Sequence, residues 1–347
     1  MPSPARTLRS ALRRGLVIPA HPLALTSART LDEPRQRALT RYYLDAGAGG
    51  LAVGVHTTQF AIRDPRHGLY RPVLQLAAEA ARGWTTRRIV MVAGVIGRTS
   101  AAVREAALAR DLGYEVALLG LGGLAHWTDE RLVAHAKAVA DELPVMGFYL
   151  QPAVGGRPLG YRFWRRLAEL ERLVAIKVAP FDRYATLDVA RAVIDAGRSG
   201  DVALYTGNDD AIVADLVTPI RTGRGAISFR GGLLGQWAVW TRAAVRLLTP
   251  SRTARRGGAG PGTRLAAGAE LTHANPPIID AANHFRGCIP GIHEVLRRQG
   301  LLRGRWCLDP REELSPGQQA EIERVSRAYP HLADDAFVRA NRDRWLA

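Results

Sequence analysis

The stretch that decides the fold is LERLVAIKVAP, residues 170–180. Its second half, VAIKVAP (174–180), is apolar throughout except for Lys177. A strand that is buried on both faces has this composition, and such strands are typical of parallel sheets covered by helices. The stretch therefore predicts a central parallel strand that carries a lysine near its end.

Similar apolar runs recur along residues 15–248, and an amphipathic segment follows each of them. The other strand candidates are 15–23, 50–56, 89–96, 116–122, 144–150, 202–208 and 225–231. The helical patterns cover 32–46, 68–82, 99–112, 128–142, 161–172, 184–197, 209–219 and 233–248. This strict alternation predicts an α/β protein, a (β/α)8 TIM barrel. A doubly wound open sheet is the alternative, although no GxGxxG turn follows the first run.

The rest of the chain suggests four segments. We expect a basic N-terminal segment over 1–14, the barrel over 15–249, a Gly/Arg-rich loop over 250–264 and a helical C-terminal extension over 265–347. The chain has no apolar run close to the ~20 residues that cross a bilayer, and its N-terminus lacks the apolar region of a signal peptide. These observations predict a cytoplasmic protein with no membrane partner.

The charge balance is strongly basic, with 48 Lys and Arg against 32 Asp and Glu and a net charge of +16. Only Lys137 and Lys177 are lysines. The charge is compatible with nucleic-acid binding. The arginines are spread along the chain, however, which favours a general preference for arginine and predicts no nucleic-acid partner. Cys288 and Cys307 lack a CxxC spacing, which excludes the usual zinc and redox motifs and leaves a single disulfide open.

The residues that close the apolar runs are the candidates for chemistry, because the active site of a (β/α)8 barrel lies at the carboxyl ends of its strands. Desolvation at Lys177 favours the neutral amine, which condenses with a ketone to form a Schiff base. Arginine cannot do this, because it stays protonated. Tyr149 ends the preceding run, and its phenol can relay protons. The alternatives are a lysine that extends to solvent and an ordinary core tyrosine.

The chain resembles the dihydrodipicolinate synthase / N-acetylneuraminate lyase family of class I aldolases from about residue 15 to about residue 300. The matching motifs are VAIKVAP around Lys177, YLQP (149–152) for Y-x-x-P, HTTQF (56–60) for GTTGE, GNDD (207–210) for G-x-D, GAIS (225–228) for G-x-I-S and HPL (21–23) for T-P-F. They occur in the family's order along the chain.

The resemblance implies a site and a reaction. Lys177 would form a covalent imine with a 2-keto acid such as pyruvate, and Tyr149 would move protons. Thr57 and Thr58 would hold the carboxylate, with Gly207 and Ile227 at the pocket wall. The resemblance also implies that no metal or organic cofactor is needed and that the chain assembles as a homodimer or homotetramer.

Several positions depart from the family pattern. His56 replaces the first glycine of GTTGE, and Gln59 replaces the second. Val154 stands where dihydrodipicolinate synthases place an arginine for their second substrate, which argues against that activity. The family's second tyrosine is missing from LLGLGGLAHW (118–127). His56 and His21 are candidates to replace it, because neutral imidazole transfers protons near neutral pH; the alternative is that both are ordinary hydrogen-bonded histidines.

We therefore expect a lyase, a Schiff-base-forming aldolase or dehydratase that acts on a 2-keto acid. One alternative is an aldolase of a phosphorylated sugar, with the phosphate bound at FRGGLLG (229–235) by Arg230, Gly231 and Gly232. The other is a non-catalytic barrel that binds a ligand or nucleic acid.

Overall fold

The computed structural model describes residues 4–255 and 261–347. The described residues form two compact units. The first contains residues 4–16, 90–233, 248–255 and 261–265. The second contains residues 17–89, 234–247 and 266–347.

The first unit is built on parallel strands in the order β10-β7-β6-β5-β4-β3. The strands are β3 (Val90–Val95), β4 (Val116–Leu119), β5 (Val145–Leu150), β6 (Leu173–Ala179), β7 (Ala203–Thr206) and β10 (Phe229–Leu234). Every residue of β6 is buried, as its apolar sequence predicts. In the registers of β6 with its neighbours, Lys177 pairs with Phe148 of β5 and with Tyr205 of β7.

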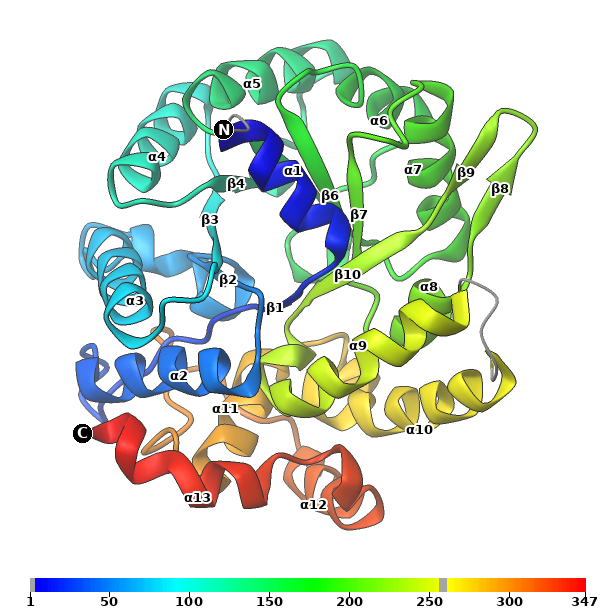
Figure 1. The fold of residues 1–347 in the computed structure, drawn as a ribbon. Coiled ribbons are helices and arrows are strands. Elements are labelled where there is room, and N and C mark those ends of the chain that lie inside the picture. Colours follow the sequence, from blue (N-terminus) through cyan, green and yellow to red (C-terminus); the bar gives the residue numbers. More distant parts are fainter. Residues whose placement is uncertain (1–3, 256–260) are drawn as a thin grey trace. The chain divides into compact units, whose positions relative to one another are not determined.

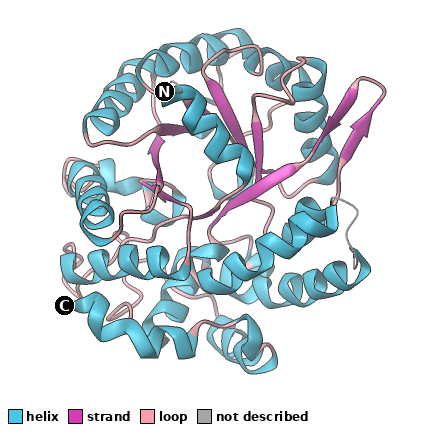
Figure 2. Cartoon of the chain, viewed as in Figure 1, coloured by secondary structure: helices cyan, strands magenta, loops and turns pink. Residues whose placement is uncertain are grey.

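Helices alternate with these strands and cover the outside of the sheet in this unit (Figures 1 and 2). They are α4 (Thr99–Asp111), α5 (Asp129–Glu142), α6 (Tyr161–Leu167), α7 (Arg183–Asp195) and α8 (Ile212–Val217). Two of them begin at side-chain caps. Thr128 accepts a hydrogen bond from the Arg131 N–H (3.3 Å), and Asp182 accepts one from the Ala185 N–H (2.9 Å).

The last strand candidate, 225–231, is placed differently from the prediction. Its first part forms β9 (Gly225–Ile227), which pairs antiparallel with β8 (Ile220–Thr222). Arg221, Gly225 and Ala226 of this hairpin are exposed, and Ile227 is buried. The parallel strand β10 begins only at Phe229. The G-x-I-S sequence resembles the start of a parallel strand, but Gly225–Ile227 pair with β8 in a hairpin here, and of these three residues only Ile227 is buried.

The basic N-terminal segment contains a helix, α1 (Pro4–Arg14), that contacts β6 and β7. Its apolar face is buried through Leu8 and Leu12. The Tyr205 hydroxyl donates a hydrogen bond to the Leu12 carbonyl (2.8 Å). An amphipathic pattern therefore lies within residues that composition marks only as basic.

The second unit contains β1 (Val17–Pro19), β2 (Gly50–Val53), α2 (Glu33–Ala46) and α3 (Tyr70–Trp84). The end of β1 lies parallel to β2, and the His21 N–H donates to the Ala52 carbonyl (2.8 Å). Two 3-10 turns, η1 (His56–Thr58) and η2 (Phe60–Arg63), follow β2. Helix α9 (Thr241–Arg255) begins in this unit.

The C-terminal extension is helical. Its helices are α10 (Pro261–Ile279), α11 (Cys288–Arg298), α12 (Gln318–Ala328) and α13 (Asp335–Leu346). Helix α13 packs along α2 (Figure 1), and the Trp345 indole donates to Asp45 (2.6 Å). The loop expected over 250–264 is helical at both ends, and its centre, 256–260, lies outside the described residues.

Asp334 completes the start of α9. Its carboxylate accepts hydrogen bonds from the Tyr42 hydroxyl (2.9 Å) and from the N–H groups of Arg242 (2.6 Å) and Ala243 (3.1 Å). Burial raises the pKa of Asp334 above its usual value, and these hydrogen bonds only partly offset that shift. The first turn of α9 is thus capped by a residue 92 positions downstream.

Both cysteines are buried, and neither forms a disulfide. Among the helices that the structure describes, none combines the length and the apolar character needed to cross a membrane.

Candidate active site

Lys177 is buried within β6, with only 7% of its surface exposed. Its Nζ lies 4.3 Å from the centroid of the Phe148 ring, a cation–π arrangement when the amine is charged. The other lysine, Lys137, is exposed on α5. Of the two lysine amines in the chain, only that of Lys177 therefore lies in the interior.

Gly207 lies directly against the Lys177 side chain. A Cβ atom on Gly207 would lie 2.8 Å from Lys177 Cε and 2.7 Å from the Cβ of Ala179. The Gly207 N–H donates to the Val178 carbonyl (2.7 Å), which fixes this approach. A glycine at this position leaves the space that the lysine chain occupies.

Replacing Gly207 with alanine is expected to displace the lysine chain and to slow imine formation at Lys177 by about 10²-fold, because small misplacements of a reacting group have effects of that size. The rate of imine trapping would measure it. Gly223→Ala is the matched control, since a Cβ on Gly223 would have no described atom within 4 Å. Equal trapping rates in the two variants would contradict the close contact.

Tyr149 does not occupy the place that the sequence predicts beside the amine. Its register partner on β6 is Val178, whereas Phe148 pairs with Lys177. The Tyr149 ring lies 5.3 Å from the ring of Trp164 on α6, and its hydroxyl accepts a hydrogen bond from the Leu159 N–H (3.3 Å). Successive side chains of a strand point to opposite faces. Tyr149 therefore faces α6, and Phe148 takes the expected position next to Lys177.

The site of a Cβ on Gly147 supports this assignment of faces. Gly147 is two residues before Tyr149 and shares its side of β5. Its Cβ would lie 3.2 Å from both Trp164 and Leu167, which belong to α6. Burial raises the pKa of Tyr149, as is usual for a phenol in a packed environment.

A buried carboxylate, Asp215, organises the ends of β6 and β7. It accepts hydrogen bonds from the Thr206 hydroxyl (2.6 Å), the Asn208 amide (3.1 Å) and the Arg183 guanidinium (2.6 Å). The Asn208 side-chain oxygen in turn accepts from the Phe181 N–H (3.1 Å). This network holds the loop that carries Gly207. Sequence reasoning missed Asp215, because it lies on the short helix α8 outside every motif.

The loops after β4 and β5 are packed against each other. A Cβ on Gly122 would lie 1.7 Å from the Gly155 carbonyl oxygen. Arg157 donates to the carbonyls of Leu124 (2.5 Å) and Trp127 (3.2 Å). Backbone from the β5 loop thus fills the space beside 118–127, the stretch that lacks the family's second tyrosine.

In the second unit, the hydroxyls of Thr57 and Thr58 are used within the fold. Thr57 donates to the Ala20 carbonyl (2.8 Å), and Thr58 donates to the His21 carbonyl (2.7 Å). The Thr58 hydroxyl also accepts from the Gly54 N–H (3.0 Å). Both side chains therefore anchor the turn η1 to the end of β1.

Gln59 explains one departure from the family pattern. Its φ of 66° lies in the left-handed region, which favours the glycine of the family motif. The side chain is buried, and its amide oxygen accepts a hydrogen bond from the Leu308 N–H (2.6 Å). A contact with the C-terminal extension thus holds the turn in a conformation that is unfavourable for glutamine.

The two histidines predicted at the site differ in their surroundings. His21 is fully buried, with Nδ1 2.8 Å from the Pro22 carbonyl oxygen and Nε2 2.9 Å from the Thr40 hydroxyl. Burial lowers its pKa to about 4. His56 is partly exposed, and its ring lies 6.0 Å from that of Phe60. His21 is therefore one of the hydrogen-bonded structural histidines.

The buried histidines predict a pH-dependent stability. Burial holds the pKa of both His21 and His293 at about 4 in the folded chain, against 6.5 for an unperturbed histidine. The unfolded chain therefore binds protons first as the pH falls, and the free energy of unfolding decreases between pH 6.5 and 4. We expect roughly 2 kcal/mol lost per histidine between pH 7.5 and 5. Urea unfolding of the wild type and of His21→Gln would test this, because the variant should lose about one histidine's share of the pH dependence.

Two other sequence expectations are wrong in this structure. Ile227, expected at the pocket wall, pairs with Ile220 in the β8–β9 hairpin and precedes the start of β10. It therefore lies away from the carboxyl end of that strand. Gly231 and Gly232, proposed for phosphate binding, lie inside β10 rather than at a helix N-terminus. A Cβ on Gly231 would lie 2.2 Å from the Leu16 carbonyl oxygen, so backbone packing accounts for this glycine.

The sequence model of the dihydrodipicolinate synthetase family matches residues 15–235. The chain belongs to this family. The curated 4-hydroxy-tetrahydrodipicolinate synthase of Exiguobacterium sp. is 30% identical to it over 179 residues, which are 51% of this chain and 57% of that protein. The match thus covers less than two thirds of that relative.

Solved structures of this family share the fold. The dihydrodipicolinate synthase from Oceanobacillus iheyensis aligns with a TM-score of 0.73 at 19% identity, covering 94% of this chain and 99% of that one. The N-acetylneuraminate lyase from Fusobacterium nucleatum aligns with a TM-score of 0.72 at 16% identity, covering 91% and 99%. These likenesses confirm the predicted (β/α)8 barrel with a helical C-terminal extension.

Proposed function

We propose that this family member is a class I aldolase or lyase that forms a Schiff base between Lys177 and a 2-keto acid such as pyruvate. The observation that carries the proposal is the buried side chain of Lys177, which belongs to β6 and lies against Gly207 in the loop after β7. Burial in an apolar interior favours the neutral, nucleophilic form of a lysine. Schiff-base formation at position 177 requires a lysine, because an arginine would stay protonated.

The amine would attack the ketone carbon to give a carbinolamine, which loses water to form the iminium. The iminium accepts the electron pair released when a bond two atoms away breaks, so cleavage, condensation and dehydration are all open to the same intermediate. The covalent imine takes the place of a metal or organic cofactor in this proposal.

We assign the keto acid's carboxylate to the turn at Thr57 and Thr58, with the Thr57 N–H as the donor. The hydroxyls of both residues donate to carbonyls, and the Thr58 N–H donates to the Val55 carbonyl (3.0 Å). Tyr149 would act as a positioning residue that packs β5 against α6, since its ring contacts Trp164. His56, which is partly exposed, is the candidate for proton transfer.

Val154 argues against dihydrodipicolinate synthesis as the specific reaction. It lies in the turn η4 (Pro152–Val154) after β5, where the family's synthases place an arginine. Arg157 lies in the same loop but donates to Leu124 and Trp127. We therefore propose that the second substrate, or the product released from the keto acid, differs from that of the synthases.

The proposal is tested by borohydride reduction in the presence of pyruvate and a panel of longer 2-keto acids, followed by peptide mass spectrometry. The chain has only two lysines, and peptide mass spectrometry distinguishes an adduct at Lys177 from one at Lys137 or at an α-amine. An adduct at Lys177 is the expected result. If every keto acid leaves Lys177 unmodified, the proposal is wrong.

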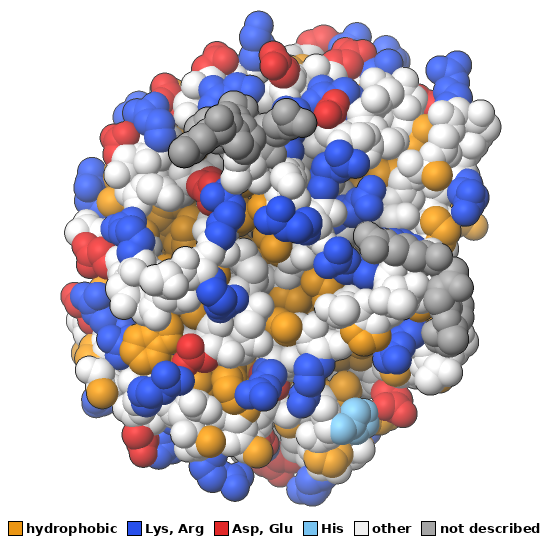
Figure 3. Space-filling model, viewed as in Figure 1, with side chains coloured by type: hydrophobic (Ala, Val, Ile, Leu, Met, Phe, Trp, Pro, Cys, Tyr) orange, Lys and Arg blue, Asp and Glu red, His pale blue; other side chains and the backbone are white. Residues whose placement is uncertain are grey.

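A nucleic-acid-binding barrel is the rival from another class. Figure 3 shows basic side chains over much of the visible face, separated by uncharged ones, and acidic side chains mostly toward its edge. A homodimer or homotetramer and a cytoplasmic location remain predictions, which light scattering and fractionation would test.

A further inference from the structure

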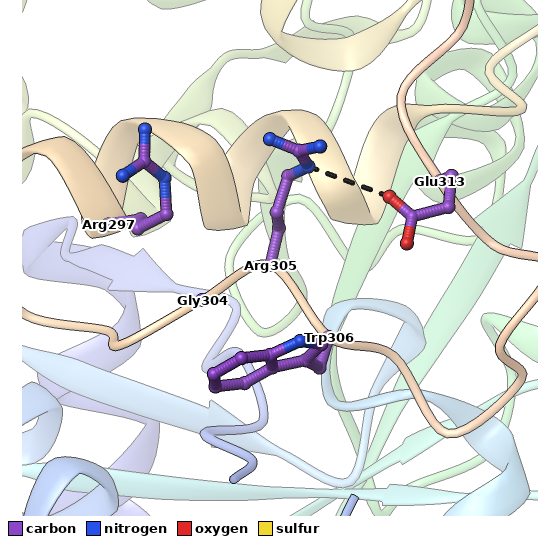
Figure 4. A pocket seen from close by; sticks show the side chains of 5 residues that line it. All are labelled: Arg297, Gly304, Arg305, Trp306 and Glu313. Atoms are coloured by element: carbon purple, nitrogen blue, oxygen red, sulfur yellow. Dashed lines mark ion pairs between the residues drawn. The ribbon is translucent and has the colours of Figure 1, made fainter. Parts of the chain in front are cut away.

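The C-terminal extension contains a cavity of about 280 Å³, shown in Figure 4. It is lined by Arg297, Gly304, Arg305, Trp306 and Glu313. Its volume is close to the ~300 Å³ at which small-ligand pockets begin. These residues belong to the second unit, and none of them has a part in the proposed imine chemistry.

One side of the cavity is formed by Arg297, whose guanidinium is held in place by hydrogen bonds to a buried carboxylate. The carboxylate of Glu294, whose side chain is fully buried, accepts hydrogen bonds from Arg297 Nε (2.8 Å) and Nη2 (2.9 Å) and from Arg298 Nε (2.7 Å). Burial raises the pKa of Glu294, but these hydrogen bonds outweigh it and lower the pKa to about 2. Arg297 is therefore fixed by an ionised partner that uses two of its three nitrogens.

Arg305 is held much more loosely. Its Nη1 lies 3.5 Å from Glu294 Oε2, and its Nε lies 3.5 Å from Glu313 Oε2. Strong charge-assisted hydrogen bonds are ~2.7–2.9 Å long. The Nε is buried and makes no hydrogen bond with the residues that the structure describes. In Figure 4 the guanidinium groups of Arg297 and Arg305 lie on one side of the Gly304–Trp306 backbone, and the Trp306 indole lies on the other.

Trp306 gives the cavity a flat apolar wall. A Cβ on Gly304 would lie 2.7–2.8 Å from three atoms of the indole, so the ring rests on the glycine backbone. Two arginines against one glutamate leave the lining with a net charge of +1. A guanidinium binds a carboxylate through two parallel hydrogen bonds. The lining thus combines an anion-binding edge with a surface for an apolar group.

We propose that this cavity is an effector site for a small monocarboxylate with a flat apolar body. The segment that lines it continues into two contacts with the rest of the unit. The Cys307 carbonyl accepts from Arg29 Nε (3.0 Å), and the Leu308 N–H donates to Gln59 (2.6 Å). A ligand that orders Gly304–Trp306 therefore also steadies Gln59 and the turn at Thr57 and Thr58. The effect on catalysis rests on the proposed function, in which this turn holds the keto acid.

Binding is tested with benzoate and its neutral isostere benzamide by isothermal titration calorimetry. We expect benzoate to bind at least ten-fold more tightly than benzamide, and Arg305→Gln and Arg305→Lys to weaken benzoate by ten-fold or more. Glu313→Gln should tighten it several-fold, because the variant removes a like charge. Arg311→Gln is the matched control, since Arg311 is exposed and pairs with Asp309 on the same segment. Equal affinity for the two ligands, or unchanged affinity in Arg305→Lys and Arg305→Gln, would overturn the site.

Coupling is tested by hydrogen exchange of the peptide that contains Thr57–Gln59, a measurement that needs no keto acid. Benzoate should slow this exchange in the wild type but not in Gln59→Gly, which removes the contact with Leu308. Slowing of the same size in Gln59→Gly would overturn the coupling. Failure of imine trapping would count against the proposed function alone, because neither the titration nor the exchange depends on it.

Discussion

Lys177→Arg is expected to abolish imine trapping and to lower turnover of the keto acid by about 10³-fold or more. The guanidinium keeps the positive charge but stays protonated, so it has no lone pair for attack on a ketone. Trapping with borohydride and pyruvate, read by intact-mass spectrometry, gives a direct result. An essential nucleophile has no substitute within the site, which is why the expected loss is this large.

The control for this variant is Lys137→Arg, which removes the other lysine of the chain. Lys137 is exposed on α5, and we expect its replacement to leave both trapping and turnover unchanged. Activity that survives in Lys177→Arg would show that the chemistry does not use an imine at this residue. Loss of trapping in Lys137→Arg but not in Lys177→Arg would show that the adduct forms at Lys137 and would contradict the proposal.

Asp215→Ala is expected to destabilise the chain by roughly 3 kcal/mol or more. The substitution leaves the Thr206 hydroxyl, the Asn208 amide and the Arg183 guanidinium without their shared acceptor, and breaking a buried ionic network has this order of cost. Because the network holds the loop with Gly207, imine trapping should also slow. Urea unfolding measures the first effect, and the trapping rate measures the second.

Asp188→Ala provides the comparison on the surface. Asp188 pairs with Arg191 on α7, and both side chains are well exposed, at 42% and 51%. Exposed pairs of this kind contribute about 0–1 kcal/mol. A loss in Asp215→Ala no larger than that in Asp188→Ala would show that the buried carboxylate does not organise the loop.

The parallel strands of the barrel were predictable because their apolar runs are buried on both faces. VAIKVAP was expected at 174–180, and β6 covers Leu173–Ala179. The start of the strand predicted at 225–231 was misplaced. The true strand begins with Phe-Arg-Gly-Gly, which lacks the continuous apolar residues by which the other strands were recognised. The parallel pairing of Phe229 with Leu204 of β7 shows that the strand starts at Phe229.

The neighbours of Lys177 were harder to predict than the lysine itself. The Y-x-x-P spacing correctly placed Tyr149 on the strand next to β6, but spacing along one chain does not fix the register between two strands. A shift of one residue moves a side chain to the other face of a sheet. Phe148 pairs with Lys177 in the structure, so the tyrosine faces α6. Likewise, the sequence around Gln59 does not show that its side chain accepts a hydrogen bond from the Leu308 N–H.

The cap that Asp334 supplies to α9 sets an order of events during synthesis. The N–H groups of Arg242 and Ala243 leave the ribosome about 90 residues before their acceptor does. At ~5–20 residues per second this is a delay of roughly 5–20 s, during which the first turn of α9 has no cap. Until then the first turn of α9 stays exposed to water, and the synthesis of the segment around Asp334 allows this helix end to be capped.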